Sequence, residues 1–233
     1  MNHWDLQAKK HGTSYEASWE DELAINLEID AISRHLNPGE RVLDVGCGNG
    51  YSTRQHKNVE IVGVDSSHEM IEAARKMGGE FLFADARELQ FHDKSFDVVY
   101  TTRCLINLPT WEDQKQAISE CIRVARRKVI LSEAFWEPLQ KLNAIRQICG
   151  LEPLVEHDFN RYLKLSKLRA FVKCEVEDFS GVYYFGSRVL RELVTDHRQW
   201  AGYSNPINTD FYNMQQKYIG GGFGVQQLAT IQL

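Results

Sequence analysis

The chain has 233 residues, enough for one large domain or for one domain with a subdomain. Hydrophobic residues make up 43% of it and charged residues 25%, which is typical of a soluble globular protein. The net charge of −5 argues against a nucleic-acid partner, because proteins that bind the phosphate backbone usually present a basic surface.

The cysteines and the first residues indicate the cellular compartment. The five cysteines are scattered and have no CxxC spacing, which indicates reduced thiols and no zinc site. The chain begins with a polar segment, and no apolar stretch approaches the length that spans a membrane. We therefore expect a cytoplasmic protein that has no metal ion and no membrane partner.

Strand and helix patterns alternate through the first half of the chain. Residues 21–36 carry apolar side chains at helical spacing, and Asn37-Pro38-Gly39 ends the expected helix. Strands are expected at 41–45, 60–65, 81–84, 96–100 and 128–132, and helices after Gly50, from the capping box at 66–69 to Gly78, and at 111–127. This alternation predicts an α/β fold, a Rossmann-like parallel sheet with helices on both faces.

The second half has weaker patterns. Residues 137–170 are expected to be helical, and residues 171–179 and 224–232 alternate as strands do. Between those strands lies an insertion, at about 183–222, that is rich in Tyr, Arg, Asn and Gly. We expect one domain with appended elements rather than two domains.

A glycine loop follows the first strand of the expected sheet. Gly46, Gly48 and Gly50 alternate with other residues directly after the apolar run at 42–45. Glycine is needed where φ is positive or where the backbone touches a ligand, and such loops bind nucleotide-like cofactors in open α/β sheets. The dinucleotide fingerprint GxGxxG is not met, because Tyr51 stands where its third glycine belongs.

Acidic residues mark the ends of three successive strands. Asp44 lies just before the loop, Asp65 ends the second strand and Asp85 follows the third. A carboxylate about twenty residues after the loop can accept the hydroxyls of a ribose, and Asp85 can reach the amine of an adenine. The loop holds no lysine or arginine, so it favours a ligand with positive charge. S-adenosylmethionine has a ribose, an adenine, an ammonium and a sulfonium, whereas the pyrophosphate of NAD would be repelled.

In these motifs the chain resembles the class I S-adenosylmethionine-dependent methyltransferases of the small-molecule type. The matching segments are Val42-Leu43-Asp44-Val45-Gly46-Cys47-Gly48-Asn49-Gly50, Val64-Asp65-Ser66 with Met70, Ala84-Asp85-Ala86, and Ser95-Phe96-Asp97-Val98-Val99. The resemblance covers about residues 38–135. It implies a three-layer sandwich around a seven-stranded sheet whose last strand, near 224–233, is antiparallel. It also implies an N-terminal lid within 1–37 and an inserted cap, with acceptor-binding elements in 136–223.

The resemblance further implies roles for single residues. The residues expected to bind the cofactor are Asp44, Gly46, Gly48, Gly50, Asp65, Ser66, Met70, Asp85, Ala86 and Thr102. Met70 could equally belong to the core. The segment 101–108 would line the chamber of methyl transfer, so Arg103 and Asn107 are the candidate catalytic residues. Arg103 could contact the carboxylate of the cofactor or the acceptor, or it could only pair with an acid at the surface. Asn107 could contact the substrate, or it could be a helix cap or a turn residue.

Two aromatic groups outside the core could complete the site. Tyr15 and Trp19 are expected either to cover the cofactor as part of the lid or to pack on the flank of the sheet. Tyr183, Tyr184 and Arg188 combine rings with a cation, a composition suited to an anionic or sugar-like acceptor, although ordinary ion pairing explains most arginines. His157 and His197 are candidate bases, with a solvated side chain favoured for each.

The sequence therefore predicts a methyltransferase that uses S-adenosylmethionine and releases S-adenosylhomocysteine. The acceptor would be an oxygen or nitrogen of a small molecule, such as a sugar or a phosphorylated metabolite. The main alternative is a catalytically silent module that binds the cofactor for another enzyme. A nicotinamide oxidoreductase lacks its catalytic set here, and a nucleic-acid methyltransferase lacks an Asn-Pro-Pro-Tyr motif after the fourth strand.

Overall fold

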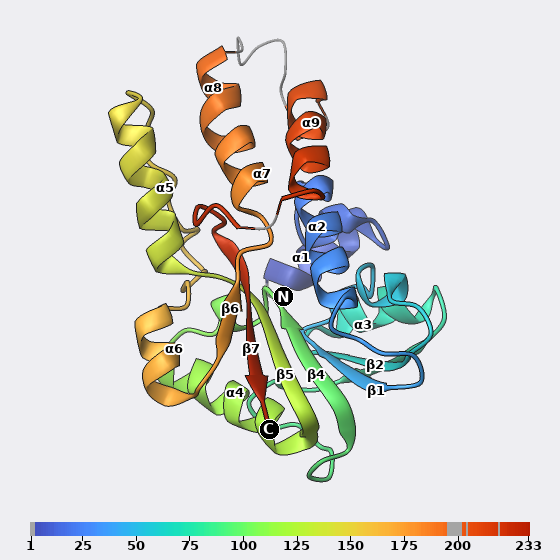
Figure 1. Cartoon of the computed structure of the whole chain (residues 1–233). Helices are drawn as coiled ribbons and strands as arrows, with labels where there is room; N and C mark the ends of the chain where they lie inside the picture. Colours follow the sequence, from blue (N-terminus) through green and yellow to red (C-terminus); the bar gives the residue numbers. More distant parts are fainter. Residues whose placement is uncertain (1–2, 195–201, 204, 219) are drawn as a thin grey trace.

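A computed structural model describes residues 3–194, 202–203, 205–218 and 220–233. Its centre is one seven-stranded sheet with the order β3-β2-β1-β4-β5-β7-β6. The strands are β1 (Arg41–Val45), β2 (Glu60–Asp65), β3 (Glu80–Phe83), β4 (Phe96–Thr102), β5 (Ala125–Ala134), β6 (Glu175–Glu177) and β7 (Gln226–Gln232). β7 is antiparallel to both of its neighbours, and in Figure 1 it runs opposite to β4 and β5 toward the C-terminus. The expected Rossmann-like sheet with an antiparallel last strand is confirmed.

Helices cover both faces of the sheet and extend beyond its edge. The α-helices of the described residues are α1 (His3–His11), α2 (Glu22–Ser33), α3 (His68–Arg75), α4 (Trp111–Val124), α5 (Trp136–Ile148), α6 (Leu165–Phe171), α7 (Gly181–Phe185), α8 (Arg191–Val194) and α9 (Pro206–Gln215). Short 3-10 turns occur at Tyr15–Ala17, Thr53–Gln55 and Leu105–Asn107, and a π-helical turn at Gly186–Leu190 joins α7 to α8. None of the helices in these described ranges is both long and apolar enough to cross a lipid bilayer.

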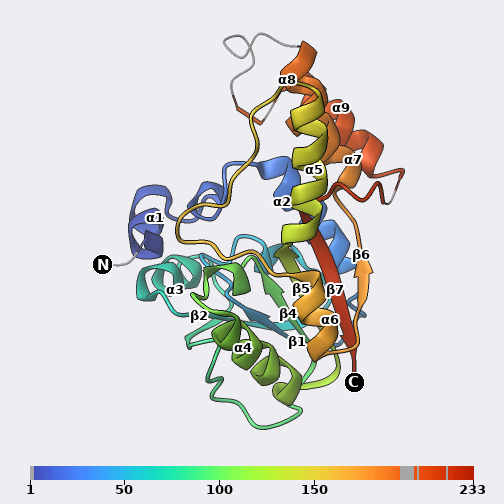
Figure 2. The same ribbon diagram turned by 90° about the vertical axis from the view of Figure 1, so that its left-hand side faces the viewer.

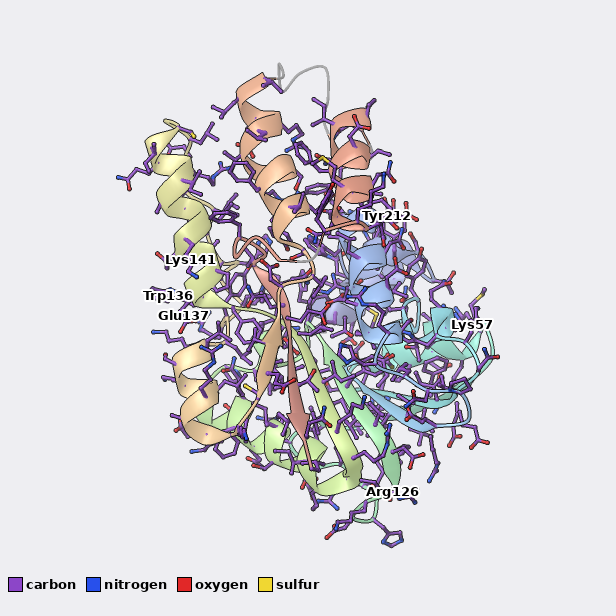
Figure 3. The ribbon with its side chains drawn as sticks, in the orientation of Figure 1. Lys57, Arg126, Trp136, Glu137, Lys141 and Tyr212 are labelled. Carbon is purple, nitrogen blue, oxygen red and sulfur yellow. The ribbon has the colours of Figure 1, made fainter. Side chains whose placement is uncertain are left out.

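Two expected helices differ from the structure. Only a single 3-10 turn follows Gly50, because residues 51–59 must also carry the chain back to β2 through Asn58, which has φ +61°. The segment 137–170 is not one helix. Gly150, with φ +72°, ends α5, and a non-helical connection leads to α6. The Glu137 carboxylate at the start of α5 accepts the backbone N–H groups of Leu165 and Ser166 and so ties the two helices together (Figure 3).

Alternating side chains on neighbouring strands define the two faces. Tyr100 is in register with Asp44, and Ser132 points the same way, where its hydroxyl donates to Glu28 of α2 at 2.6 Å. α2 therefore packs on this face. Thr101 and Glu133 point to the opposite face, and the Glu133 carboxylate accepts from the Thr101 hydroxyl and from the turn that precedes α4. Side-chain alternation in strands thus separates two buried polar clusters.

The glycine loop packs tightly against its surroundings at two positions. A Cβ on Gly46, which has φ +83°, would lie 2.5 Å from the Cβ of Cys104 just beyond β4. A Cβ on Gly50, which has φ +71°, would lie 2.6 Å from the Phe81 ring of β3. Real side chains do not approach so closely, so both positions require glycine. Gly50 was expected to bind the cofactor, but the structure gives it a packing role against β3.

The inserted helices do not form the exposed acceptor clamp that the sequence suggested. Tyr183 is completely buried, and Tyr184 and Arg188 are 5% and 6% exposed. The Tyr183 hydroxyl donates to Asp21 at 2.7 Å, and Arg188 donates to the other oxygen of the same carboxylate at 2.5 Å. Asp21 is the N-cap of α2 and is itself fully buried. Tyr183 and Arg188 therefore anchor the insertion to α2 through Asp21, which lies more than 160 residues away in the sequence.

Gly50→Ala is expected to lower the free energy of unfolding by about 2–4 kcal/mol, since it adds overpacking against Phe81 to the strain of a left-handed residue. Gly39→Ala is the matched control, because Gly39 has φ +82° with nothing near its missing Cβ. It should show only the backbone strain, about 1–2 kcal/mol. Urea unfolding measures both, and equal losses for the two variants would contradict the packing role of Gly50.

Arg188→Met is expected to lower the free energy of unfolding by about 3–5 kcal/mol, because it leaves the buried Asp21 carboxylate without its cation. Arg126→Met is the control. Arg126 projects from the edge of the molecule (Figure 3), where it pairs with Asp97 at 3.2 Å. Loss of this exposed pair should change stability by less than about 1 kcal/mol. A fully stable Arg188→Met protein would return Arg188 to the candidates for acceptor binding.

Candidate active site

A pocket opens at the carboxyl ends of β1, β2 and β4, where the strand order switches direction. Most of the residues proposed from the sequence line it: Asp44, Gly46, Gly48, Asp65, Ser66, Met70, Asp85, Ala86, Thr102, Arg103 and Asn107. The crevice between two strands whose connections leave in opposite directions is the usual ligand site of open α/β sheets. The sequence did not single out Trp4, Ser18, Asn49 and Arg87, which also line the pocket.

Asp44 is a buried carboxylate with one satisfied and one unsatisfied oxygen. Its Oδ2 accepts hydrogen bonds from the Thr53 hydroxyl at 2.6 Å and from the Tyr100 hydroxyl at 2.8 Å. Its Oδ1 is buried and has no hydrogen-bond partner in the described part of the chain. Burial raises the pKa of Asp44 to about 7, because the charged form loses hydration. A cationic ligand group would supply the partner that Oδ1 lacks.

Asp65 joins the glycine loop to the start of α3. One carboxylate oxygen accepts the backbone N–H of Gly48 at 2.9 Å, and the other accepts that of Ser67 at 2.8 Å. Burial raises the pKa of Asp65, and these backbone donors oppose the shift. Ser67, rather than Ser66, caps α3 by accepting the N–H of Met70 at 3.2 Å. The acid that ends β2 is thus fixed at the centre of the pocket wall.

Asp85 lies on the rim of the pocket in an ion pair. Arg87 donates to it at 2.6 Å and to Asp113 at 2.9 Å. Hydrogen bonding from Arg87 lowers the pKa of Asp85, so this carboxylate is ionised and neutralised by its neighbour. Arg87 is correspondingly engaged by two acids.

The segment after β4 forms the opposite wall. Arg103 has φ +48°, and its backbone is held by Ser132, whose carbonyl accepts its N–H, and by Asn107, whose amide donates to its carbonyl at 2.7 Å. Its Nε lies 3.4 Å from the Oε2 of Glu28, and its guanidinium lies 5.1 Å from the centre of the Trp19 ring. Arg103 is thus enclosed by α2 and the N-terminal segment, with only 14% of its side chain exposed.

Several polar atoms in these walls are buried without a hydrogen-bond partner among the described residues. They are the Oδ1 atoms of Asp44 and Asn107, the Thr102 Oγ1, and the Nε and Nη1 atoms of Arg103. Folded proteins leave few such atoms, and each one points to strain or to an absent ligand or water. Their concentration around one pocket favours a polar ligand with both donor and acceptor groups.

The N-terminal segment covers the mouth of the pocket. Asn49 in the glycine loop donates to the carbonyls of Gly12 and Ser14, at 2.8 and 2.7 Å. Trp4 and Ser18 line the pocket directly. Tyr15 and Trp19 do not; Tyr15 packs against Tyr51 instead. The sequence predicted aromatic cover by Tyr15 and Trp19, whereas Trp4 is the aromatic residue of the segment's first helix that lines the pocket.

The connection between α5 and α6 reaches the same mouth. Figure 2 shows it passing close to α1, and the Phe159 ring stacks on His3 with 4.5 Å between ring centres. His157 stacks on Phe159 and does not line the pocket. His197 lies outside the described residues. Within the described ranges, no group of three His, Cys, Asp or Glu side chains is placed to hold a metal ion.

The residues present fit S-adenosylmethionine. The fit rests on the unpartnered Asp44 oxygen, which suits a cationic group, and on the Asp65 carboxylate, which a ribose could approach. Arg103, which the sequence named as a candidate catalytic residue, lines the opposite wall of the pocket. Asp44, Asp65 and the loop from Gly46 to Gly48 would hold the cofactor.

Comparison with known proteins agrees with this geometry. Residues 42–128 match a family model described as a methyltransferase domain. A demethylmenaquinone methyltransferase of Thermotoga maritima is 38% identical over 99 residues, which cover 40% of this chain and 42% of that protein. An O-methyltransferase of Pyrenophora dematioidea is 27% identical over 224 residues, 79% of this chain and 83% of that protein. The chain spans about half the length of several other curated relatives that it matches.

Solved structures show the same fold over the whole chain. A Thermotoga maritima protein, described as an S-adenosylmethionine-dependent methyltransferase and possible histamine N-methyltransferase, superposes with a TM-score of 0.62 at 18% identity. The superposition covers 97% of this chain and 98% of that one. Residues 42–128 therefore belong to the methyltransferase-domain family, and the seven-stranded sheet and the acidic pocket beside the glycine loop agree with the fold of the class I S-adenosylmethionine-dependent methyltransferases.

Proposed function

We propose that the protein transfers a methyl group from S-adenosylmethionine to an oxygen or nitrogen of a small-molecule acceptor. The observation that carries this proposal is the Asp44 carboxylate, buried beside the glycine loop with one oxygen unpartnered. The Asp44 Oδ1 is buried without a hydrogen-bond donor among the described residues, and a ligand ammonium would provide one.

The remaining cofactor residues have assignable roles. Both Asp65 oxygens already accept a backbone N–H, and each retains capacity to accept a ribose hydroxyl. Asp85 stands farther out on the rim, where it pairs with Arg87, and its carboxylate is the acceptor that we assign to the adenine amine. Met70, only 2% exposed, lies at the base of the pocket and supports the adenine by packing.

The acceptor side of the pocket favours a small substrate. Trp4 lines it, and the contact of α1 with Phe159 bridges its mouth. A nucleic-acid strand would have to displace this cover, and the net charge of −5 offers it no attraction. Relatives named O-methyltransferases favour oxygen as the methylated atom.

Little further chemistry is required of the chain. The bound cofactor supplies a methyl group that its sulfonium already activates. The protein then contributes alignment and exclusion of water, and well-oriented reactants reach effective molarities of about 10⁵ M or more. Arg103 and Asn107 are the polar side chains that face this step from the wall after β4.

Calorimetry and turnover together test the proposal. We expect S-adenosylhomocysteine to bind, and Asp65→Ala to weaken binding at least about tenfold through loss of charge-assisted hydrogen bonds. Asp30→Ala is the control, because Asp30 is an exposed acid on α2 that accepts from Gln216. Binding without methyl transfer to any compound of a metabolite pool would favour the silent module, and transfer only to bulk tRNA would contradict a small acceptor.

Cofactor affinity is also expected to depend on pH through Asp44. Because its pKa in the free protein is about 7, protonation competes with the ligand cation below that pH. Affinity for S-adenosylhomocysteine should level off about one unit above pH 7 and should fall by up to about tenfold per pH unit below pH 7.

Asp44→Asn keeps the acceptor for Thr53 and Tyr100 and should bind weakly with no such pH dependence. Asp30→Asn is the control. Asp30 is an exposed acid on α2 that does not line the pocket, so this variant should keep the pH dependence of the wild type. Titrations between pH 5.5 and 7.5 compare the three proteins, and an unchanged pH profile in Asp44→Asn would remove Asp44 from the ammonium site.

A further inference from the structure

Two arginines line the pocket, and they differ in how their charge is used. Arg87 donates to Asp85 and Asp113 and is satisfied by both. Arg103 forms no such bidentate pair in the described part of the chain, and its Nε and Nη1 have no hydrogen-bond partner. Arg103 is therefore the arginine in the pocket that can still donate hydrogen bonds to a ligand.

The backbone of Arg103 is held in an unfavourable conformation. Left-handed φ values are uncommon for residues with a long side chain, and they persist where the surroundings enforce them. Here the Ser132 carbonyl and the Asn107 amide hold the two polar groups of the Arg103 backbone, at 2.9 and 2.7 Å. β4 ends at Thr102, just before this residue, and the Arg103 side chain lines the pocket.

The guanidinium is enclosed on several sides. The Glu28 carboxylate forms an ion pair with it: Glu28 Oε2 lies 3.4 Å from Nε without hydrogen-bond geometry, while Glu28 Oε1 accepts from the Ser132 hydroxyl. The Trp19 ring lies over it, and its Nη2 reaches the Ser18 hydroxyl only at 3.4 Å. Glu28 is fully buried, so it offsets the arginine charge without saturating its donors.

We propose that Arg103 is the anion receptor of this pocket and binds a carboxylate or phosphate oxyanion of a ligand through its unpartnered N–H groups. A planar guanidinium suits such groups because it can donate two parallel hydrogen bonds. The inference rests on the proposed function. The oxyanion has two possible sources, the α-carboxylate of the cofactor and an acidic group of the acceptor.

The charge distribution supports this position for an anion. On the opposite wall Asp44 and Asp65 repel an anion, and on the rim Arg87 is neutralised by two acids. Of the two arginines in the described pocket, Arg103 is therefore the one whose N–H groups lack hydrogen-bond acceptors. A ligand with an ammonium and a carboxylate would be oriented by the two walls together.

Calorimetry with two ligands separates the sources. S-adenosylhomocysteine is compared with its decarboxylated analogue, which keeps the amine and lacks the carboxylate. If the cofactor supplies the anion, the wild type prefers the carboxylate by about tenfold or more, and Arg103→Met abolishes the preference. Arg87→Met is the matched control from the same pocket and should keep it.

If the acceptor supplies the anion, the two ligands bind wild type equally. Inorganic phosphate titrated into protein saturated with S-adenosylhomocysteine should then bind, and Arg103→Met should weaken it about tenfold or more. No preference and no Arg103-dependent phosphate binding would overturn the inference. Failure of the wild type to bind S-adenosylhomocysteine at all would overturn the proposed function instead.

Two further variants distinguish a loss of anion binding from a loss of folding. Arg103→Met leaves Glu28 buried beside a neutral side chain, so the double variant Glu28→Gln/Arg103→Met removes both charges of the pair together. It should show the same loss as the single variant. Arg103→Lys keeps the charge without the planar fork, and an intermediate preference is expected. Unchanged anion binding in the folded double variant would again overturn the inference.

Discussion

The pocket depends on how closely the chain leaving β4 approaches the glycine loop leaving β1. Gly46 has no side chain, and Cys104 occupies the place where its Cβ would stand. Because of this contact, the segment after β4, which carries Arg103 and Asn107, lies directly beside the glycine loop. Asp44 and Asp65 line the pocket on the side of that loop. Because the connections of β1 and β4 leave the sheet in opposite directions, the two walls meet at a crevice that no helix fills.

Buried carboxylates organise the rest of the region. Asp65 ties the loop to α3, Asp44 ties β1 to β4 through Tyr100, and Glu133 holds the turn after β4. Each replaces a hydration shell with fixed donors, which is the condition for keeping an acid inside a protein. Asp44 departs from that condition because its Oδ1 lacks a donor among the described residues, and for this reason the proposed function assigns the ligand cation to Asp44.

The N-terminal segment and the connection from α5 to α6 have a different part in the site. They contribute few of the polar atoms that face the cofactor, yet they cover the mouth through Trp4, Ser18 and the contact of His3 with Phe159. Low local dielectric strengthens the electrostatic interactions of the pocket, so this cover increases the effect of both Asp44 and Arg103.

The sequence by itself determined the sheet and the acidic wall. Strand periodicity, the alternating glycines and the acids at strand ends are local patterns, and parallel strands necessarily bring their carboxyl ends to one edge. Asp44, Asp65, Asp85 and Arg103 could therefore be named as pocket residues without the structure. The tertiary structure alone decided which polar groups are satisfied. Arg188 meets Asp21 and Arg103 faces Glu28 across long stretches of sequence, and only the packing of α2 leaves one arginine anchored in the core and the other with donors free.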